Sequence, residues 1–171
     1  MRSKYLLLLI PLGLTATTWG CWYYSTSGSS LPPHIKTVAV PLAENETLEC
    51  GIETTLTNAI IASFVSDNTL RVVDRKVADS LIEVKVIDVK DEPLTYSAEK
   101  TGEKAQEYRI SIQVQVFYLD LRKDRKLWEE KLLEGWGVYE APGRPEQRAE
   151  GIEAAAKMLA SEILERTVVG W

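Results

Sequence analysis

The chain has 171 residues, of which 45% are hydrophobic and 26% charged, so one globular domain with a sizeable core is expected. Its formal net charge of −5 argues against non-specific binding to DNA or RNA, which needs a broad positive surface. One histidine and two cysteines exclude the usual zinc ligand sets. A Ser-His-Asp or Cys-His site would have to use His34, and a lone loop histidine is usually solvated, so no metal, cofactor or catalytic site is predicted.

The first 20 residues follow the pattern of a bacterial export signal. Arg2 and Lys4 form a short positive region, residues 5–14 are an apolar run, and small residues lead up to Gly20. The apolar run is shorter than the roughly 20 residues of a membrane-spanning helix. Removal of this signal would leave 18 basic and 25 acidic residues, a net charge of −7.

Cys21 follows Gly20 directly, as the acylated cysteine of a bacterial lipoprotein does. The small residue before it suits the signal peptidase. Thr18 stands where such signals usually have an aliphatic residue, and Trp19 is bulky for its place. We predict that Cys21 is the lipid attachment site. Plain secretion with a nearby cut, or an uncleaved anchor, are the alternatives.

The second cysteine, Cys50, has two possible roles. Export to an oxidising compartment would allow a Cys21–Cys50 disulfide. If Cys21 carries lipid, Cys50 is unpaired and is expected as a small apolar residue at a helix start. Trp22, rather than Asp, follows Cys21 and favours the outer membrane over the inner membrane.

The chain therefore divides into three parts. Residues 1–20 are the predicted lipoprotein signal peptide. Residues 21–34 are a lipidated flexible tether, because they are rich in Ser and Gly and end in Pro-Pro. Residues 35–168 form a single domain.

Periodicity predicts the elements of the domain's first half. A short apolar strand is expected at 36–42, a turn and helix entry at 44–47, a helix at 52–66 and a brief strand at 70–74. The alternation of a strand at 80–91 slips by one residue, which predicts a β-bulge near 86–87. The polar residues 91–106 are expected to form a long loop, a kind of segment that often serves function.

The second half contains the clearest strand, at 107–120. Six side chains alternate towards the core: Tyr108, Ile110, Ile112, Val114, Val116 and Tyr118. Arg109, Ser111, Gln113 and Gln115 point to the opposite, wet face. A turn at 122–126, a strand at 127–140 and a helix at 146–167 follow. The order predicts an α+β fold, with two helices on one face of a four- to five-stranded, mixed but mostly antiparallel sheet.

Several stretches together resemble a known family. They are "GCWYYS", "SSLPPHIKTVAVPLAENET", "GIETTLTNAIIASFVSDNTLRVVD", "ADSLIEVKV", "EYRISIQVQVFYLD" and "LWEE". In this order they resemble LptE lipoproteins of lipopolysaccharide assembly, of the type found outside the enteric bacteria. The similarity covers nearly the whole chain and rests on co-occurrence rather than on any catalytic motif.

The resemblance implies a concrete role. Such lipoproteins are held by acyl chains in the inner leaflet of the outer membrane and face the periplasm. They plug the large β-barrel that inserts lipopolysaccharide into the outer leaflet, help it assemble, and bind lipopolysaccharide. The family's fold is two helices against a four-stranded mixed sheet. The expected partners are therefore a barrel, lipopolysaccharide and the membrane, with no nucleic acid and no enzyme activity.

Lipopolysaccharide carries phosphates, so a cluster of cations is expected to bind it. The densest such cluster, here called the basic cluster, is Arg122, Lys123, Arg125 and Lys126. A solvated turn is the plainer interpretation of these residues. Arg144 and Arg148 are a weaker second candidate.

Two other functions remain open. The chain could serve another outer-membrane secretion or envelope complex, because lipoproteins of such machines have similar small α+β domains. It could also be an exported hydrolase using neighbouring acids, such as Glu129-Glu130 or Asp91-Glu92, although no nucleophile–base set accompanies them.

Overall fold

The computed structural model describes residues 31–99, 102–140 and 145–170, and only the backbone at 95–99 and 102–106. The predicted signal peptide, Cys21 and Arg144 lie outside this part of the chain. The described elements run in the order β1 (Thr37–Ala39), β2 (Glu44–Asn45), α1 (Ile52–Asp67), β3 (Arg71–Val72), β4 (Ser80–Glu99), β5 (Gly102–Asp120), β6 (Arg125–Glu140) and α2 (Pro145–Val168).

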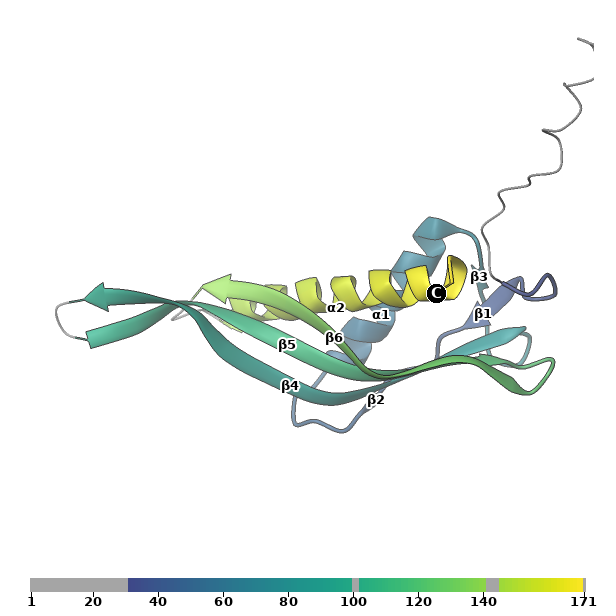
Figure 1. The fold of residues 1–171 in the computed structure, drawn as a ribbon, viewed down its shortest axis with the longest axis horizontal. Helices are drawn as coiled ribbons and strands as arrows, with labels where there is room; N and C mark the ends of the chain where they lie inside the picture. The colour runs from purple at the N-terminus through teal and green to yellow at the C-terminus, as the bar shows by residue number, and fades with distance from the viewer. Residues whose placement is uncertain (1–30, 100–101, 141–144, 171) are drawn as a thin grey trace, which may run out of the picture.

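The strands form one mixed sheet in the order β3-β1-β4-β5-β6, with β2 paired to β4 (Figure 1). β1 lies parallel to both β3 and β4, so the sheet is mixed, as expected. The β4–β5 and β5–β6 pairs are antiparallel. The predicted α+β class is confirmed; the short strand β2, which was not expected, brings the sheet to six strands, and β3 corresponds to the strand expected at 70–74.

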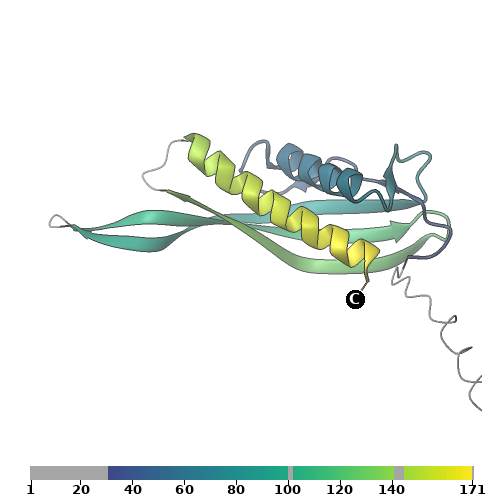
Figure 2. The same ribbon diagram turned by 90° about the horizontal axis from the view of Figure 1, so that it is seen from above.

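Both helices pack on the same face of the sheet, and the opposite face is left open (Figure 2). The predicted alternation of β5 is confirmed from Ile110 to Tyr118, whose inward side chains are at most 1% exposed. Leu56, Ile60 and Phe64 of α1 and Leu159 and Ile163 of α2 complete this core. Each of these side chains contributes about 1.5–3 kcal/mol by burial.

The predicted bulge in β4 is present. The register against β5 shifts between Val86 and Asp88, so Ile87 is the additional residue. Because of this one inserted residue, Val89 pairs with Ile112 and its apolar side chain returns to the same face of the sheet as Ile112. The wet-face assignment was wrong for Ser111, which is 6% exposed and lies beside Trp136 of β6.

The expected loop at 91–106 was also wrong. β4 and β5 continue as a paired hairpin to Glu99 and Gly102. This hairpin extends beyond the helices as a long two-stranded arm (Figures 1 and 2). Its polar sequence carries no burial signal because neither face of the arm needs a core, although strand pairing satisfies the backbone all the same.

Three other boundaries differ from the prediction. The strand expected at 36–42 includes only Thr37–Ala39, and Pro41, which follows shortly after, has no backbone N–H to donate to a neighbouring strand. Glu44–Asn45, expected as a turn, is a short strand on β4. Arg125 and Lys126, assigned to a turn, are the first residues of β6. Among the described residues, neither helix is both long and apolar enough to span a membrane.

Helix α2 approaches β6 to backbone contact. A Cβ built on Gly137 would lie 2.0 Å from the carbonyl oxygen of Gly151 in α2. A Cβ on Gly135 would lie 2.6 Å from the carbonyl oxygen of Ala155. The inward positions of this part of β6 are therefore restricted to glycine.

Candidate functional site

The basic cluster lies at the end of the sheet where the described chain begins (Figure 1). Three segments meet there: the chain entry at 31–36, the β3–β4 turn at 73–79 and the β5–β6 turn at 121–124. We call this the entry end. Two buried aspartates, Asp79 and Asp120, hold the three segments together.

Asp120 joins the chain entry to the end of β5. Its Oδ2 lies 2.8 Å from Nε2 of His34, which was expected to be solvated and is instead a partner of this carboxylate. Its Oδ1 accepts the backbone N–H groups of Arg122 at 3.0 Å and Lys123 at 3.1 Å. Burial alone would raise the pKa of Asp120, but these hydrogen bonds outweigh it and lower the pKa.

Asp79 joins the same entry segment to the β5–β6 turn. Its Oδ2 accepts the backbone N–H groups of Lys36 at 3.0 Å and Thr37 at 3.1 Å. Its Oδ1 accepts a hydrogen bond from Nε of Arg122, at a distance of 2.6 Å. The hydrogen bond from Lys36, followed by those from Thr37 and Arg122, lowers the pKa of Asp79 to about 2.

The structure gives three of the four basic-cluster side chains an intramolecular carboxylate. Arg122 pairs with Asp79, Arg125 lies 4.0 Å from Asp120, and Lys126 pairs with Glu129. Lys126 also lies over the ring of Phe117 at 5.4 Å. Within the described residues, the side chain of Lys123 makes no such pair.

Exposure separates the two signs of charge at the entry end. The Arg122 and Arg125 side chains are 62% and 56% exposed, whereas those of Asp79 and Asp120 are 6% and 0% exposed. The cations therefore face solvent with their carboxylates beneath them. This arrangement keeps the outer surface positive even though the pairs are locally neutral.

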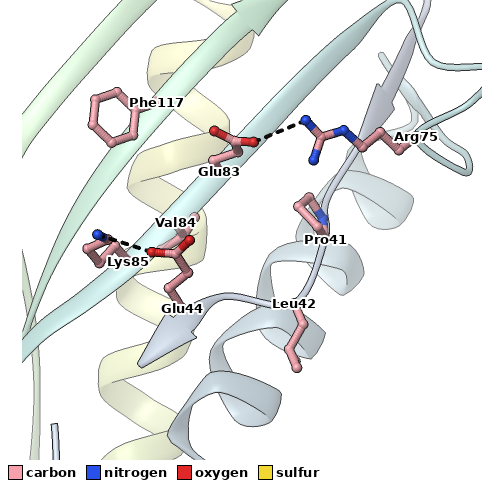
Figure 3. Close-up of a pocket in the computed structure, with 8 residues that line it drawn as sticks. All are labelled: Pro41, Leu42, Glu44, Arg75, Glu83, Val84, Lys85 and Phe117. Carbon is pink, nitrogen blue, oxygen red and sulfur yellow. Dashed lines mark ion pairs between the residues drawn. The ribbon is translucent and has the colours of Figure 1, made fainter. Parts of the chain in front are cut away.

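A pocket of about 320 Å³ lies beside the cluster, between the β1–β2 connection and the open faces of β4 and β5 (Figure 3). Pro41, Leu42, Val84 and Phe117 supply its apolar part. Its charged side chains pair with one another: Arg75 with Glu83 at 3.5 Å, and Lys85 with Glu44 at 3.1 Å. All four of these charges therefore have a partner within the pocket.

The open face of the sheet is polar, with a few aromatic and aliphatic side chains. Gln113 and Gln115 are half-buried on it. The guanidinium of Arg109 lies 5.1 Å from the ring centre of Trp136, and its buried Nε has no hydrogen-bond partner within the described residues. Trp136 and Val138 are 43% and 40% exposed, so this face can both hydrogen-bond and pack against a partner.

The second basic candidate has a structural role. Both terminal nitrogens of Arg148 bond the carboxylate of Glu49, at 2.8 and 2.9 Å, and Asp91 of β4 accepts a further bond at 3.0 Å. Tyr139 donates its hydroxyl to Asp91 at 2.9 Å. Arg148 thus ties α2 to the base of the β4–β5 arm, and two carboxylates already share its guanidinium.

The acidic pairs considered for hydrolysis are separated by the strands that carry them. Glu129 bonds Lys126 on the open face, whereas Glu130 bonds Arg166 on the helix-covered face at 2.7 Å. Consecutive strand residues point to opposite faces, so the two carboxylates cannot share a substrate. In the described part of the chain, no three His, Cys, Asp or Glu side chains gather as metal ligands.

Sequence reasoning missed the residues that build the entry end. Asp79 and its partner Arg122 are 43 positions apart, and His34 and Asp120 are 86 apart. No local pattern marks such pairs. Cys50 was expected as an apolar residue at a helix start, but it lies exposed just before α1, where Gly51 adopts a φ of 85°.

Comparison with known protein families decides the assignment. The model of the family "LptE: Lipopolysaccharide-assembly" matches residues 35–167, which is nearly the entire folded domain. The chain belongs to the LptE family. The resemblance found in the sequence is thereby confirmed, and membership in the LptE family supports a lipoprotein role in lipopolysaccharide assembly.

Solved structures agree on the fold. A crystal structure of a protein from Xanthomonas campestris has a TM-score of 0.59 at 10% identity and covers 82% of this chain and 88% of that chain. A hypothetical protein from Chlamydia trachomatis has a TM-score of 0.50 at 12% identity, with 77% and 95% covered. At these identities the likeness to the LptE-family chain shows the fold alone. No curated protein matches the chain.

Proposed function

We propose that this LptE-family chain is an acylated outer-membrane lipoprotein that sits inside, and helps assemble, the β-barrel that inserts lipopolysaccharide into the outer leaflet. The family match over residues 35–167 carries the proposal. A domain that fills a polar barrel lumen needs a hydrogen-bonding surface. The open sheet face, with Gln113, Gln115 and Arg109, supplies one.

The long β4–β5 arm suits the same task. β4 has 20 residues, so at about 3.3 Å per residue it is on the order of 65 Å long. Such a length exceeds the thickness of a bilayer's hydrocarbon core, about 30 Å. The sheet can therefore run along a barrel interior, with the arm beyond Pro93, about 20 Å of that length, at one end of it.

Recovery of the barrel is the direct test. Tagged protein purified from membranes is expected to bring down a large β-barrel of the lipopolysaccharide-export type, identified by mass spectrometry. An untagged strain and an unrelated tagged lipoprotein serve as controls. Recovery of a secretin or a curli-type channel instead would contradict the proposal and favour another envelope complex.

Acylation of Cys21 is the second part of the proposal. Cys21→Ala is expected to abolish incorporation of labelled palmitate and to move the protein out of the membrane fraction, because the thiol is the acyl acceptor. The domain, which begins at Ile35, should keep its circular dichroism spectrum. Cys50→Ala is the matched control and should keep both label and location. Palmitate incorporated into Cys21→Ala would refute the assignment.

The third part concerns lipopolysaccharide. We propose that its phosphates meet the basic cluster, where Arg122, Lys123, Arg125 and Lys126 form the exposed layer described above. Lys123 is the side chain most available, because Asp79, Asp120 and Glu129 already engage the other three. A phosphate can still approach from the solvent side of these arginines, whose planar groups offer several donors.

A further inference from the structure

The entry end carries an apolar residue at the surface of each of its two turns. Val77 of the β3–β4 turn is 69% exposed, and Leu121 of the β5–β6 turn is 37% exposed. Cations adjoin both: Arg75 and Lys76 precede Val77, and Arg122 follows Leu121. Aliphatic side chains flanked by long basic ones suit the boundary between headgroups and acyl chains.

The two turns form one surface. The backbone N–H of Leu121 donates to the carbonyl oxygen of Asp79 at 2.9 Å, and Arg122 reaches across to the carboxylate of Asp79. Asp79 ends the β3–β4 turn, so these bonds hold the two turns in fixed relation. Val77 and Leu121 therefore belong to turns that lie at the same end of the sheet and are bonded to each other.

The exposed charge of this surface is positive. Six exposed cations lie in the two turns or at the start of β6: Arg75, Lys76, Arg122, Lys123, Arg125 and Lys126. Asp74 and Asp124 are the exposed acids of the turns, and four of the cations pair with carboxylates that are less exposed than they are: Glu83, Asp79, Asp120 and Glu129. A positive end on a chain with more acidic than basic residues indicates an anionic partner.

The length of chain before the described residues places a bilayer near this end. Leu31 is ten positions after Cys21, so the chain between them reaches about 35 Å when fully extended. The typical end-to-end distance of a Gly- and Ser-rich chain of that length is roughly 17 Å. The far end of the β4–β5 arm lies about 65 Å along the sheet, beyond this reach.

We propose that the entry end docks on the anionic phospholipid surface of the leaflet that holds the acylated Cys21, with Val77 and Leu121 at headgroup depth. This goes beyond the proposed role in the barrel; it shares with that role the acylation of Cys21 and the basic cluster, for which phospholipid and lipopolysaccharide phosphates would be alternative ligands. Acyl chains joined to a basic patch hold a protein on a membrane more firmly than either does alone. Each basic residue near such a surface strengthens binding about fivefold.

The test measures depth in the acylated, full-length protein reconstituted into vesicles. A nitroxide on Val77→Cys, in a Cys50→Ser background, reports the entry end. A nitroxide on native Cys50 is the matched control, because α1 separates it from this end by about 24 Å. Collision with oxygen, compared with a water-soluble nickel chelate, distinguishes a lipid from an aqueous position.

In vesicles of phosphatidylcholine and phosphatidylglycerol, the label at position 77 is expected to be shielded from the chelate while the label at Cys50 stays aqueous. The double change Lys76→Glu and Lys123→Glu should abolish the shielding without unfolding the domain, since neither side chain has a structural partner in the described chain. Equal access of the chelate to positions 77 and 50 would overturn the proposal, and so would failure of the protein to bind these vesicles.

Separate arms distinguish the phosphate sources. Vesicles of phosphatidylcholine alone should shield position 77 much less, because they lack the net negative charge. Lipopolysaccharide micelles test the other source with the same labels. Shielding by lipopolysaccharide but not by anionic phospholipid would overturn docking while leaving the proposed lipopolysaccharide contact standing. Barrel recovery is a separate measurement, so the two proposals can fail independently.

Discussion

Gly137→Ala is expected to lower the free energy of unfolding by about 3 kcal/mol or more, or to prevent folding. The new Cβ would lie 2.0 Å from the carbonyl oxygen of Gly151 and 2.8 Å from its carbonyl carbon. Both are backbone atoms of α2, so no side-chain rotation can relieve the overlap. The helix would have to move away from β6 and open the core at Leu159.

The matched control is the next residue along β6. Val138 points to the open face and is 40% exposed, so Val138→Ala should change the free energy of unfolding by about 0.5 kcal/mol at most. Urea unfolding followed by circular dichroism compares the two variants. Equal stability of Gly137→Ala and the unmodified protein would contradict the close approach of α2 to β6.

Asp79→Asn is expected to lower the free energy of unfolding by about 3 kcal/mol at neutral pH. The change removes the negative charge that Arg122 faces, and it puts an amide where the N–H groups of Lys36 and Thr37 need an acceptor. Removing one partner of a buried ion pair leaves the remaining charge and donors unsatisfied, and this lowers the free energy of unfolding more than replacing both partners would. Asp124→Asn is the control, because Asp124 is exposed and its φ of 45° is tolerated by Asn.

The pH dependence gives Asp79 its own signature. Its folded pKa of about 2 lies below the ordinary 3.8, so its contribution is fully present above pH 3.8 and is lost as the pH falls towards 2. The loss amounts to roughly 2 kcal/mol. The difference in unfolding free energy between Asp79→Asn and the unmodified protein should therefore shrink over this acid range. If the difference stays constant from pH 4 to about pH 2, the contacts of Asp79 do not stabilise its ionised form, and the proposed lowering of its pKa is wrong.

The alternation of β5 could be predicted because its residue types follow burial: apolar residues occupy the core-facing positions and polar residues most of the others. The bulge at Ile87 was equally visible, since a slip in parity is a local event. The arm beyond Pro93 was not, because a hairpin without a core leaves no apolar pattern. The short strand at Glu44–Asn45 was missed for a related reason: two residues are too few to show a period.

The site was harder to predict than the fold. Sequence reasoning found the basic cluster from its density of charge, but not the carboxylates beneath it, because Asp79 and Asp120 come close only through the sheet order. It also passed over Gly151 and Ala155, four residues apart on α2, whose small size lets the helix meet Gly135 and Gly137. Such small residues can be read from the sequence once a close helix–strand contact is sought.

The contact between His34 and Asp120 also sets an order in time. The chain is made from its N-terminus, and 86 positions separate these two residues. At typical synthesis rates the second appears about 4 to 17 s after the first. During that interval Asp79 can already bind Lys36 and Thr37, but His34 still lacks its partner, so the contact of His34 is among the last to form at this end of the domain.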